Sequence, residues 1–189
     1  MATLDLGRLE AMGFASIGKN VLISDRASFH GCQNIKIGNN VRIDDFCVLS
    51  AGEGGIEIGN HIHVAIFTSL IGRGRITLSD FCNLSARVSI YSSSDDYSGA
   101  TMTNPMVPSQ FTGVTHAPVF IGKHVIIGCG SVVLPGVTLE EGVAIGALSM
   151  VQSDCGAFGV YVGTPARLLR ERRRDLLDLE RRFLASKAP

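Results

Sequence analysis

Two groups of side chains in this sequence could carry out chemistry. The first is a set of five histidines, the residue type whose charge changes most readily near neutral pH; they are His30, His61, His63, His116 and His124. The second is a polar segment from Ser92 to Tyr97 that contains Asp95 and Asp96. Its hydroxyl and carboxyl groups suit a site for a polyol such as a sugar, and they equally suit a solvated loop.

The composition excludes several other kinds of site. The five cysteines are odd in number and form no C-x-x-C pair, which argues against a zinc ribbon or a disulfide framework. We expect them to be small buried thiols in a reducing cytoplasm. The formal net charge of zero disfavours a general nucleic-acid or membrane-surface binder. No apolar run or leader pattern predicts a membrane span or a secretory signal.

The elements that must position these groups follow from a stride of six residues. Eighteen apolar residues form six triplets, which are Ile17, Ile23 and Phe29; Ile37, Ile43 and Leu49; Ile58, Val64 and Leu70; Leu78, Leu84 and Ile90; Ile121, Ile127 and Val133; and Leu139, Ile145 and Val151. The residue two positions before each of them is aliphatic or small, as expected for strands whose alternate residues share a face. Each triplet therefore predicts three short strands, which make one triangular coil of an all-β solenoid.

Two segments interrupt the stride. Residues 91–118 form a long loop, which we expect to be functional because its beginning is polar. Residues 165–185 combine leucines and arginines in the pattern of an amphipathic helix, which could cover the open end of the solenoid and its unpaired strand edges. The sequence thus predicts a β-helix domain at residues 1–164, with the loop inserted, and a C-terminal helical tail at residues 165–189.

The repeat resembles a known family of enzymes. The segment from Ile121 to Val151 and the later Gly163-Thr164-Pro165-Ala166-Arg167 are similar to hexapeptide-repeat acyltransferases, in the branch of galactoside, maltose, xenobiotic and surface-polysaccharide sugar acetyltransferases. The resemblance covers roughly residues 15–170. It implies a left-handed parallel β-helix, a homotrimer, acetyl-CoA as the donor and a role in cell-surface polysaccharide biosynthesis. Apolar residues at outward strand positions, such as Val48 and Phe120, independently favour a subunit interface.

The resemblance also places coenzyme A along one corner of the solenoid. Gly128 and Cys129 lie 18 residues before Gly146 and Ala147, so these small residues stack on adjacent coils, where a pantetheine arm could approach the backbone. Tight turns would explain the glycines equally well. The contacts that the family implies come from Ile126, Gly128, Cys129, Ala147, Ser149, Pro165, Arg167 and Arg170. The two arginines are expected to bind the phosphates of coenzyme A.

The resemblance does not supply the residue that would accept the proton, because this sequence has Asp95 where the resembling enzymes have a histidine. An aspartate with an ordinary pKa is a weak base at neutral pH. Three alternatives are open: Asp95 acts alone, the acceptor is an amine that needs little help, or another histidine has taken over. We favour His63 as the base, paired across a subunit interface with Asp95 or Asp96. His124 ranks second.

The sequence therefore predicts an acetyl-CoA-dependent acetyltransferase of the cytoplasm that uses no metal ion. Its acceptor is a sugar hydroxyl or the amine of a nucleotide-linked amino sugar, which Ser94 and Tyr97 are expected to contact. A structural trimer without activity is the alternative, because the usual histidine is missing. A γ-class carbonic anhydrase, which would need three histidines around zinc, is less favoured.

Overall fold

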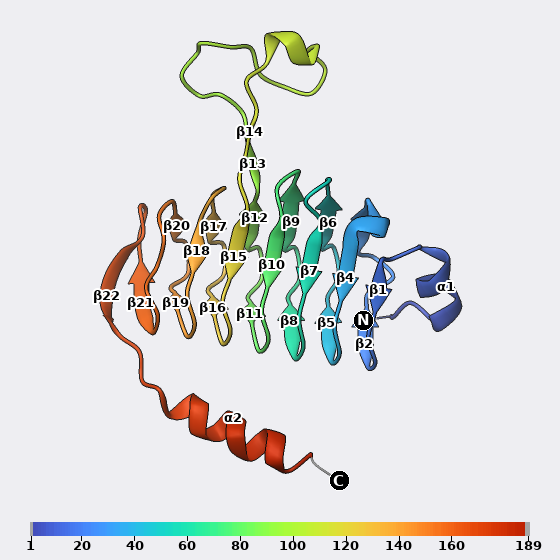
Figure 1. Cartoon of the computed structure of the whole chain (residues 1–189), viewed down its shortest axis with the longest axis vertical. Helices are drawn as coiled ribbons and strands as arrows, with labels where there is room; N and C mark the ends of the chain where they lie inside the picture. The colour runs from blue at the N-terminus through green and yellow to red at the C-terminus, as the bar shows by residue number, and fades with distance from the viewer. Residues whose placement is uncertain (1, 188–189) are drawn as a thin grey trace.

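Three parallel β-sheets form the three faces of an elongated column (Figure 1). This computed structural model describes residues 2–187 of the chain. Strands that follow one another along the chain belong to different sheets, so the backbone crosses each face once per coil. The predicted solenoid is confirmed, with six full coils from β1 to β20 and a partial coil after them.

The first sheet contains β1 (Ser16–Ile17), β4 (Ile35–Ile37), β7 (Ile56–Ile58), β10 (Ile76–Leu78), β15 (Val119–Ile121) and β18 (Thr138–Leu139). The second contains β2 (Val21–Ile23), β5 (Val41–Ile43), β8 (Ile62–Val64), β11 (Asn83–Leu84), β16 (Ile126–Ile127), β19 (Ala144–Ile145), β21 (Gly159–Val162) and β22 (Arg167–Glu171). The third contains β3 (Ser28–His30), β6 (Val48–Ala51), β9 (Ser69–Gly72), β12 (Ser89–Tyr91), β17 (Val132–Val133) and β20 (Met150–Val151).

The residues of the six-residue stride fill the inside of the column. In the first sheet, for example, Ile37, Ile58 and Leu78 lie directly over one another in register. Sixteen of the eighteen stride residues are buried, while Ile17 and Phe29 of the first coil are half-buried because that coil has a neighbour on one side only. Each fully buried aliphatic side chain stabilises the fold by roughly 1.5–3 kcal/mol relative to an exposed one.

The glycine that follows many inward residues allows close packing between coils. A Cβ atom on Gly18 would lie 2.5 Å from the backbone of the next coil, and one on Gly128 would lie 2.5 Å from the nitrogen of Ala147. The left-handed backbone occurs two positions later, as at Asn40 and His61 with φ of 56° and 57°. The glycines are therefore needed because coils about 4.8 Å apart leave no room for a side chain, and they do not supply the left-handed turn.

The long loop projects from the column after β12 (Figure 1). Its two ends are joined by the antiparallel pair β13 (Ser93–Ser94) and β14 (Thr115–His116). We call residues 95–114 the arm and the two paired strands its stem. A single turn of 3-10 helix, Ser109–Phe111, lies within the arm, and another, Cys32–Asn34, precedes β4. The predicted loop is therefore an arm with a hydrogen-bonded base.

The C-terminal segment is less helical than the sequence predicts. A helix was expected from Pro165 onward, but residues Arg167–Glu171 form β22, and the helix α2 occupies Asp175–Ala185. β22 pairs antiparallel with β21. Without β22, the outer edge of β21 would be unpaired at the end of the second sheet. A short amphipathic helix is marginal by itself, so these strand hydrogen bonds decide the conformation of residues 167–171.

The helix α2 packs along the corner between the first and second sheets and does not cover the open end of the column. The rings of His61, Phe81 and His124 stack along this corner, with centroids 4.9 and 5.0 Å apart. Phe183 of α2 meets His61 and Phe81 edge-on. Glu180 Oε2 lies 2.8 Å from His124 Nε2. Within residues 2–187, no helix is long and apolar enough to cross a membrane.

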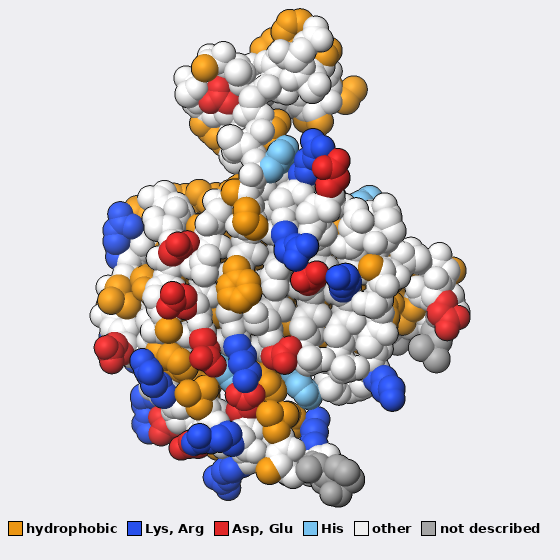
Figure 2. All heavy atoms as spheres, viewed as in Figure 1, with side chains coloured by type: hydrophobic (Ala, Val, Ile, Leu, Met, Phe, Trp, Pro, Cys, Tyr) orange, Lys and Arg blue, Asp and Glu red, His pale blue; other side chains and the backbone are white. Residues whose placement is uncertain are grey.

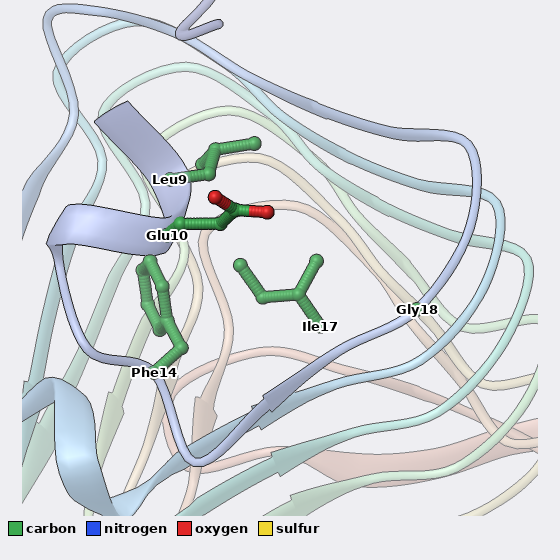
Figure 3. A pocket seen from close by; sticks show the side chains of 5 residues that line it. All are labelled: Leu9, Glu10, Phe14, Ile17 and Gly18. Atoms are coloured by element: carbon green, nitrogen blue, oxygen red, sulfur yellow. The ribbon is translucent and has the colours of Figure 1, made fainter. Parts of the chain in front are cut away.

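A second short helix, α1 (Leu6–Ala11), lies at the N-terminal end of the column (Figure 1). It leaves a hollow of about 390 Å³ against the first coil. Figure 3 shows that apolar side chains, among them Phe14 and Ile17, face this hollow together with the single carboxylate of Glu10. None of the predicted site residues lines this hollow, so we place no chemistry there.

Candidate functional site

Asp95 lies where two hollows of the surface meet. The solenoid-side hollow, of about 360 Å³, extends from the stem to Tyr91, Tyr97 and Val132. The arm-side hollow, of about 680 Å³, extends from the stem to Ile71 and to the inner surface of the arm. Ser93, Ser94 and Asp95 line both. Ser94 and Tyr97, which are predicted to contact the acceptor, are thus brought together with Asp95, which is predicted to be catalytic, at the base of the arm.

Asp95 and Asp96 differ in what binds their carboxylates. Asp96 accepts hydrogen bonds from the backbone N–H groups of Ser98 (2.8 Å) and Thr101 (2.9 Å) and from the Thr101 hydroxyl (3.0 Å). These bonds, those from Ser98 foremost, hold the pKa of Asp96 well below its ordinary value. Asp95 is exposed, and within residues 2–187 its carboxylate has no hydrogen bond or ion pair. Asp96 therefore holds the conformation of the arm, its expected catalytic role stays a prediction, and the carboxylate of Asp95 is open to a ligand.

The other polar groups at the base of the arm hold the stem. Ser93 Oγ accepts a backbone N–H of the preceding coil at 2.8 Å and lies 2.8 Å from His116 Nδ1. The Ser94 hydroxyl donates to the carbonyl of Asp95 at 3.2 Å. Tyr97, in contrast, is almost fully exposed. Asp95 and Tyr97 are therefore the side chains here that a ligand can reach without breaking a bond of the stem.

His63 lies on the outer surface of the second sheet, where its partner is Asp44 of the preceding coil. His63 Nε2 is 2.8 Å from Asp44 Oδ2, and Arg42 Nε donates to Asp44 Oδ1 at 2.7 Å. Burial acts most strongly on the pKa of Asp44 and raises it, but the bonds to His63 and Arg42 together outweigh burial and lower that pKa. A carboxylate of its own chain therefore orients His63. The predicted pairing with Asp95 of another chain stays a prediction.

Sequence reasoning missed Asp44, although a signal for it exists. Asp44 lies 19 residues before His63, which is close to the length of one coil. The two residues therefore belong to neighbouring strands of the second sheet, at the end of β5 and within β8. The other histidine ranked as a base, His124, is bound to Glu180 and is only 10% exposed at its side chain. It therefore belongs to the contact with α2.

Small residues line the corner between the second and third sheets in the fifth and sixth coils. β16 and β19 pair in register, so Gly128 and Cys129 lie over Gly146 and Ala147 as predicted. Cys129 and Ala147 are exposed. In the second and third coils the same corner carries two stacked phenylalanine rings instead. In the fifth and sixth coils the equivalent positions are Gly130 and the exposed Leu148, so the small residues open to a ligand at this corner are Cys129 and Ala147.

Ser149, another residue expected to bind coenzyme A, already uses its hydroxyl within the chain. Ser149 is buried, and its hydroxyl donates to the carbonyl of Gly146 (2.8 Å) and accepts the N–H of Gly163 (3.1 Å). Its hydroxyl closes a turn and is not presented to a ligand, because both bonds lie inside the chain. The expected contact of this side chain with coenzyme A is thus not supported.

The C-terminal motif presents two cations. Arg167 and Arg170 are exposed on β22, and within the described chain their guanidinium groups bond only to backbone carbonyls. Each keeps several N–H donors for an anion. Pro165 precedes this strand and is half-buried, as is Ile126 on the outer surface of β16.

The thiols differ in accessibility. Burial raises the pKa of Cys82 to about 12 and those of Cys47 and Cys155 to about 11. These thiols are therefore unreactive at neutral pH, while Cys129 is exposed at the small-residue corner. In the part of the chain that the structure describes, no group of three or more His, Cys, Asp or Glu residues could hold a metal ion.

Comparison with known proteins agrees with this geometry. The family model of the bacterial transferase hexapeptide (six repeats) matches residues 118–153. Over 186 residues, the chain is 62% identical to an Escherichia coli protein named dTDP-4-amino-4,6-dideoxy-D-glucose acyltransferase, covering 98% of this chain and 97% of that protein.

Solved structures of one further relative superpose on nearly the whole chain. AntD, an N-acyltransferase from Bacillus cereus, in complex with dTDP and 3-hydroxybutyryl-CoA gives a TM-score of 0.92 at 44% identity, covering 97% of each chain. A variant of AntD with dTDP-4-amino-4,6-dideoxyglucose and coenzyme A gives 0.93 at 43% identity, covering 98% of each. The predicted fold, a left-handed parallel β-helix with a C-terminal helix, is thereby confirmed.

Proposed function

The chain belongs to the hexapeptide-repeat acyltransferases, and we propose that it moves an acyl group from coenzyme A to the 4-amine of a dTDP-linked 4-amino-4,6-dideoxyhexose. The protein is an acyltransferase enzyme, so the alternative of a structural trimer without activity is not supported. Its Escherichia coli relative is named for that amino sugar. AntD binds the same nucleotide sugar beside coenzyme A.

The observation that carries an amine acceptor is the unpaired carboxylate of Asp95. An enzyme that acylates a hydroxyl needs a base near neutral pKa to remove the hydroxyl proton. A carboxylate is a weaker base than the histidine that the resembling enzymes have at this position. A carboxylate does, however, bind and orient an ammonium or amine group well. The replacement of the family's histidine by Asp95 therefore favours nitrogen over oxygen as the acceptor atom.

The reaction needs modest help from the protein. The neutral amine attacks the thioester carbonyl, a C–N bond forms and the C–S bond breaks, and the proton lost from nitrogen ends on the departing thiolate of coenzyme A. Asp95 holds the amine so that its lone pair points at the carbonyl carbon, which is a gain from orientation. His63, held by Asp44, is the candidate to relay the proton.

The donor would lie along the corner where Cys129 and Ala147 are exposed. AntD in complex with 3-hydroxybutyryl-CoA shows that a relative accepts an acyl-CoA thioester. Arg167 and Arg170 would bind the phosphate groups of coenzyme A, because both keep free guanidinium donors. Acetyl-CoA remains our expected donor.

A homotrimer would complete this site. The outward row of the third sheet is uncharged; it consists of Ser28, Val48, Ser69, Ser89, Val132 and Met150. The face seen in Figure 2 instead carries charged side chains of both signs. The first sheet, for example, has an ion pair of Lys36 with Glu57. The uncharged face suits a subunit contact, and there His63 of one chain would approach Asp95 of the next.

The cellular setting follows from the same chemistry. All five cysteines are free thiols, which fits a reducing cytoplasm. The named relatives act on dTDP-sugars, and a nucleotide-activated amino sugar is a precursor for glycan assembly. We therefore place the enzyme in the cytoplasm and in cell-surface polysaccharide biosynthesis.

Steady-state kinetics with a panel of acceptors tests the proposal. Acetyl-CoA turnover is expected with dTDP-4-amino-4,6-dideoxyglucose and to be absent with maltose, a galactoside or a dTDP-sugar that has a 4-hydroxyl. Equal turnover with the hydroxyl acceptors would contradict an amine-specific enzyme.

His63→Ala is expected to lower kcat with little change in the KM for acetyl-CoA, and His30→Ala, at the far end of the column, serves as its control.

A further inference from the structure

The arm-side hollow has a charged side and an apolar side. Its apolar side consists of Ile71, Pro105, Val107, Pro108 and Val114. Two of its polar side chains on the arm bond within the arm: Asn104 Oδ1 accepts a backbone N–H at 2.9 Å, and the Thr112 hydroxyl donates to a backbone carbonyl at 3.3 Å. The third, Ser109, also lines the hollow, and no hydrogen bond of its hydroxyl is found within the described residues. Asp95 supplies the negative charge. A ligand here therefore meets the carboxylate of Asp95 and a group of aliphatic side chains.

The solenoid-side hollow differs in its chemistry although it shares Asp95. Its wall includes Tyr91 and Tyr97, whose phenol groups can hydrogen-bond to a polar ligand. Asp95 therefore has tyrosine side chains beside it in the solenoid-side hollow and aliphatic side chains beside it in the arm-side hollow. Figure 2 shows hydrophobic side chains at several places on the surface of the arm.

The acceptor proposed above has a matching edge. In a 4-amino-4,6-dideoxyhexose, the amine is on C4 and the C6 methyl is on C5, the adjacent ring carbon. A site that holds the amine must therefore also face the methyl group. A carboxylate next to aliphatic side chains is complementary to this pair of substituents, whereas a 6-hydroxymethyl group would place a hydroxyl against those aliphatic side chains.

We propose that the arm-side hollow binds this edge of the sugar, with Asp95 at the C4 amine and Val107 and Val114 against the C6 methyl, so that the arm selects 6-deoxy sugars. The inference rests on the proposed function and adds to it the group that the arm recognises. Val107 is half-buried and Val114 is 42% exposed, so both have surface that a ligand can cover. The arm thus determines specificity, while the column supplies the donor site.

The expected discrimination is limited by physical chemistry. An aliphatic pocket rejects an analogue that adds one hydroxyl by about 100-fold at best. Because Val114 keeps contact with solvent, we expect a preference of roughly 10- to 100-fold in kcat/KM for the 6-deoxy acceptor.

The test compares two acceptors that differ in one oxygen atom, dTDP-4-amino-4,6-dideoxyglucose and dTDP-4-amino-4-deoxyglucose. Val107→Thr and Val114→Thr keep the volume of the side chain and add a hydroxyl that can bond the 6-hydroxyl. The double variant is expected to lower the ratio of kcat/KM values at least about fivefold relative to wild type, because the hydroxyl acceptor gains a partner. The KM for acetyl-CoA should not change, which reports an intact donor site.

Val132→Thr is the matched control, because Val132 lines the solenoid-side hollow. It is expected to leave the acceptor ratio unchanged, whatever it does to the overall rate. A shift of the ratio by Val132→Thr but not by the arm variants would overturn the inference, as would a wild-type ratio near one with good turnover of both amino sugars. Absence of turnover with both amino sugars would instead refute the proposed function, and the inference with it.

Discussion

At the scale of single residues, the chemistry depends on which carboxylates are already engaged. Asp44 is bound by His63 and Arg42, and Asp96 is bound by the backbone of the arm. Asp95, their counterpart without such partners, is exposed between two hollows. Three aspartates of one sequence therefore have three settings: one orients a histidine, one holds a loop, and one is proposed to meet a ligand.

Asp95→Asn is expected to lower kcat/KM for the amino-sugar acceptor roughly 10- to 100-fold, mainly through KM. The substitution keeps the shape of the side chain and removes the charge, and a hydrogen bond to a charged group is worth about 1.5–3 kcal/mol. The KM for acetyl-CoA should be unaffected. Asp25→Asn, an exposed aspartate of the first coil, is the control; equal kinetics of the two variants would show that Asp95 does not bind the acceptor.

Cys129 is expected to be the thiol most rapidly alkylated by iodoacetamide in the native enzyme, because Cys47, Cys82 and Cys155 are buried with raised pKa values. Coenzyme A at a saturating concentration should slow this reaction by at least about tenfold if it covers the corner. Peptide mapping by mass spectrometry follows the modified residue. Alkylation of Cys129 at the same rate with and without coenzyme A would place the donor elsewhere.

At the scale of elements, α2 connects the last coil to coils in the middle of the column. Its contacts are Glu180 with His124 and Lys123, and Phe183 on the rings of His61 and Phe81. The guanidinium of Arg172, in the segment before α2, also donates to the carbonyl of His124. A C-terminal segment that crosses several coils in this way resists their separation, because opening one interface requires α2 to detach.

Glu180→Gln is expected to destabilise the contact of α2 by about 1–3 kcal/mol at neutral pH. Burial acts most strongly on the pKa of Glu180 and raises it, but Lys123 and His124 outweigh burial and lower that pKa in the folded state. The stabilisation is therefore present above the unfolded pKa of Glu and is lost as pH falls through the lower, folded pKa.

Hydrogen exchange of the α2 amides measures this effect between pH 3 and pH 7. Exchange in the wild-type helix should accelerate, relative to the intrinsic rate, only on the acid side of this range. In Glu180→Gln it should be fast throughout. Glu171→Gln, an exposed position on β22, should behave like wild type, and a wild-type pH profile in Glu180→Gln would exclude Glu180 as the pH-dependent contact.

At the scale of the whole molecule, each coil is buried by its neighbours, so the first coil, which has a neighbour on one side only, is the least buried. Ile127 is fully buried in the fifth coil, whereas Ile17 in the first coil is half-buried. The first coil is covered in part by α1, which leaves the hollow described above.

Ile127→Ala is expected to lower the free energy of unfolding by roughly 2–5 kcal/mol, because it leaves a cavity among packed side chains. Ile17→Ala should cost about 1 kcal/mol, since part of this side chain already contacts solvent. Denaturant unfolding at one fixed protein concentration compares the two, because the stability of an oligomer depends on concentration. Equal losses would contradict a graded column.

Much of this architecture could be predicted from the sequence, because the repeat is local. An inward residue every six positions specifies one strand and one turn wherever it occurs, so all eighteen strands of the six coils were located without the structure. The corner of small residues at Gly128 and Ala147 follows from the same arithmetic, since it depends only on the length of one coil.

What the tertiary structure decided concerns side chains that meet across coils or outside the repeat. Which carboxylate faces His63, which aspartate is left for a ligand, where α2 packs and why residues 167–171 form a strand all depend on partners distant in sequence. The periodic sequence determined the column because each coil repeats the same short-range packing. It could not determine the site, because hydrogen bonds and hollows at the base of the arm form only once the coils are stacked.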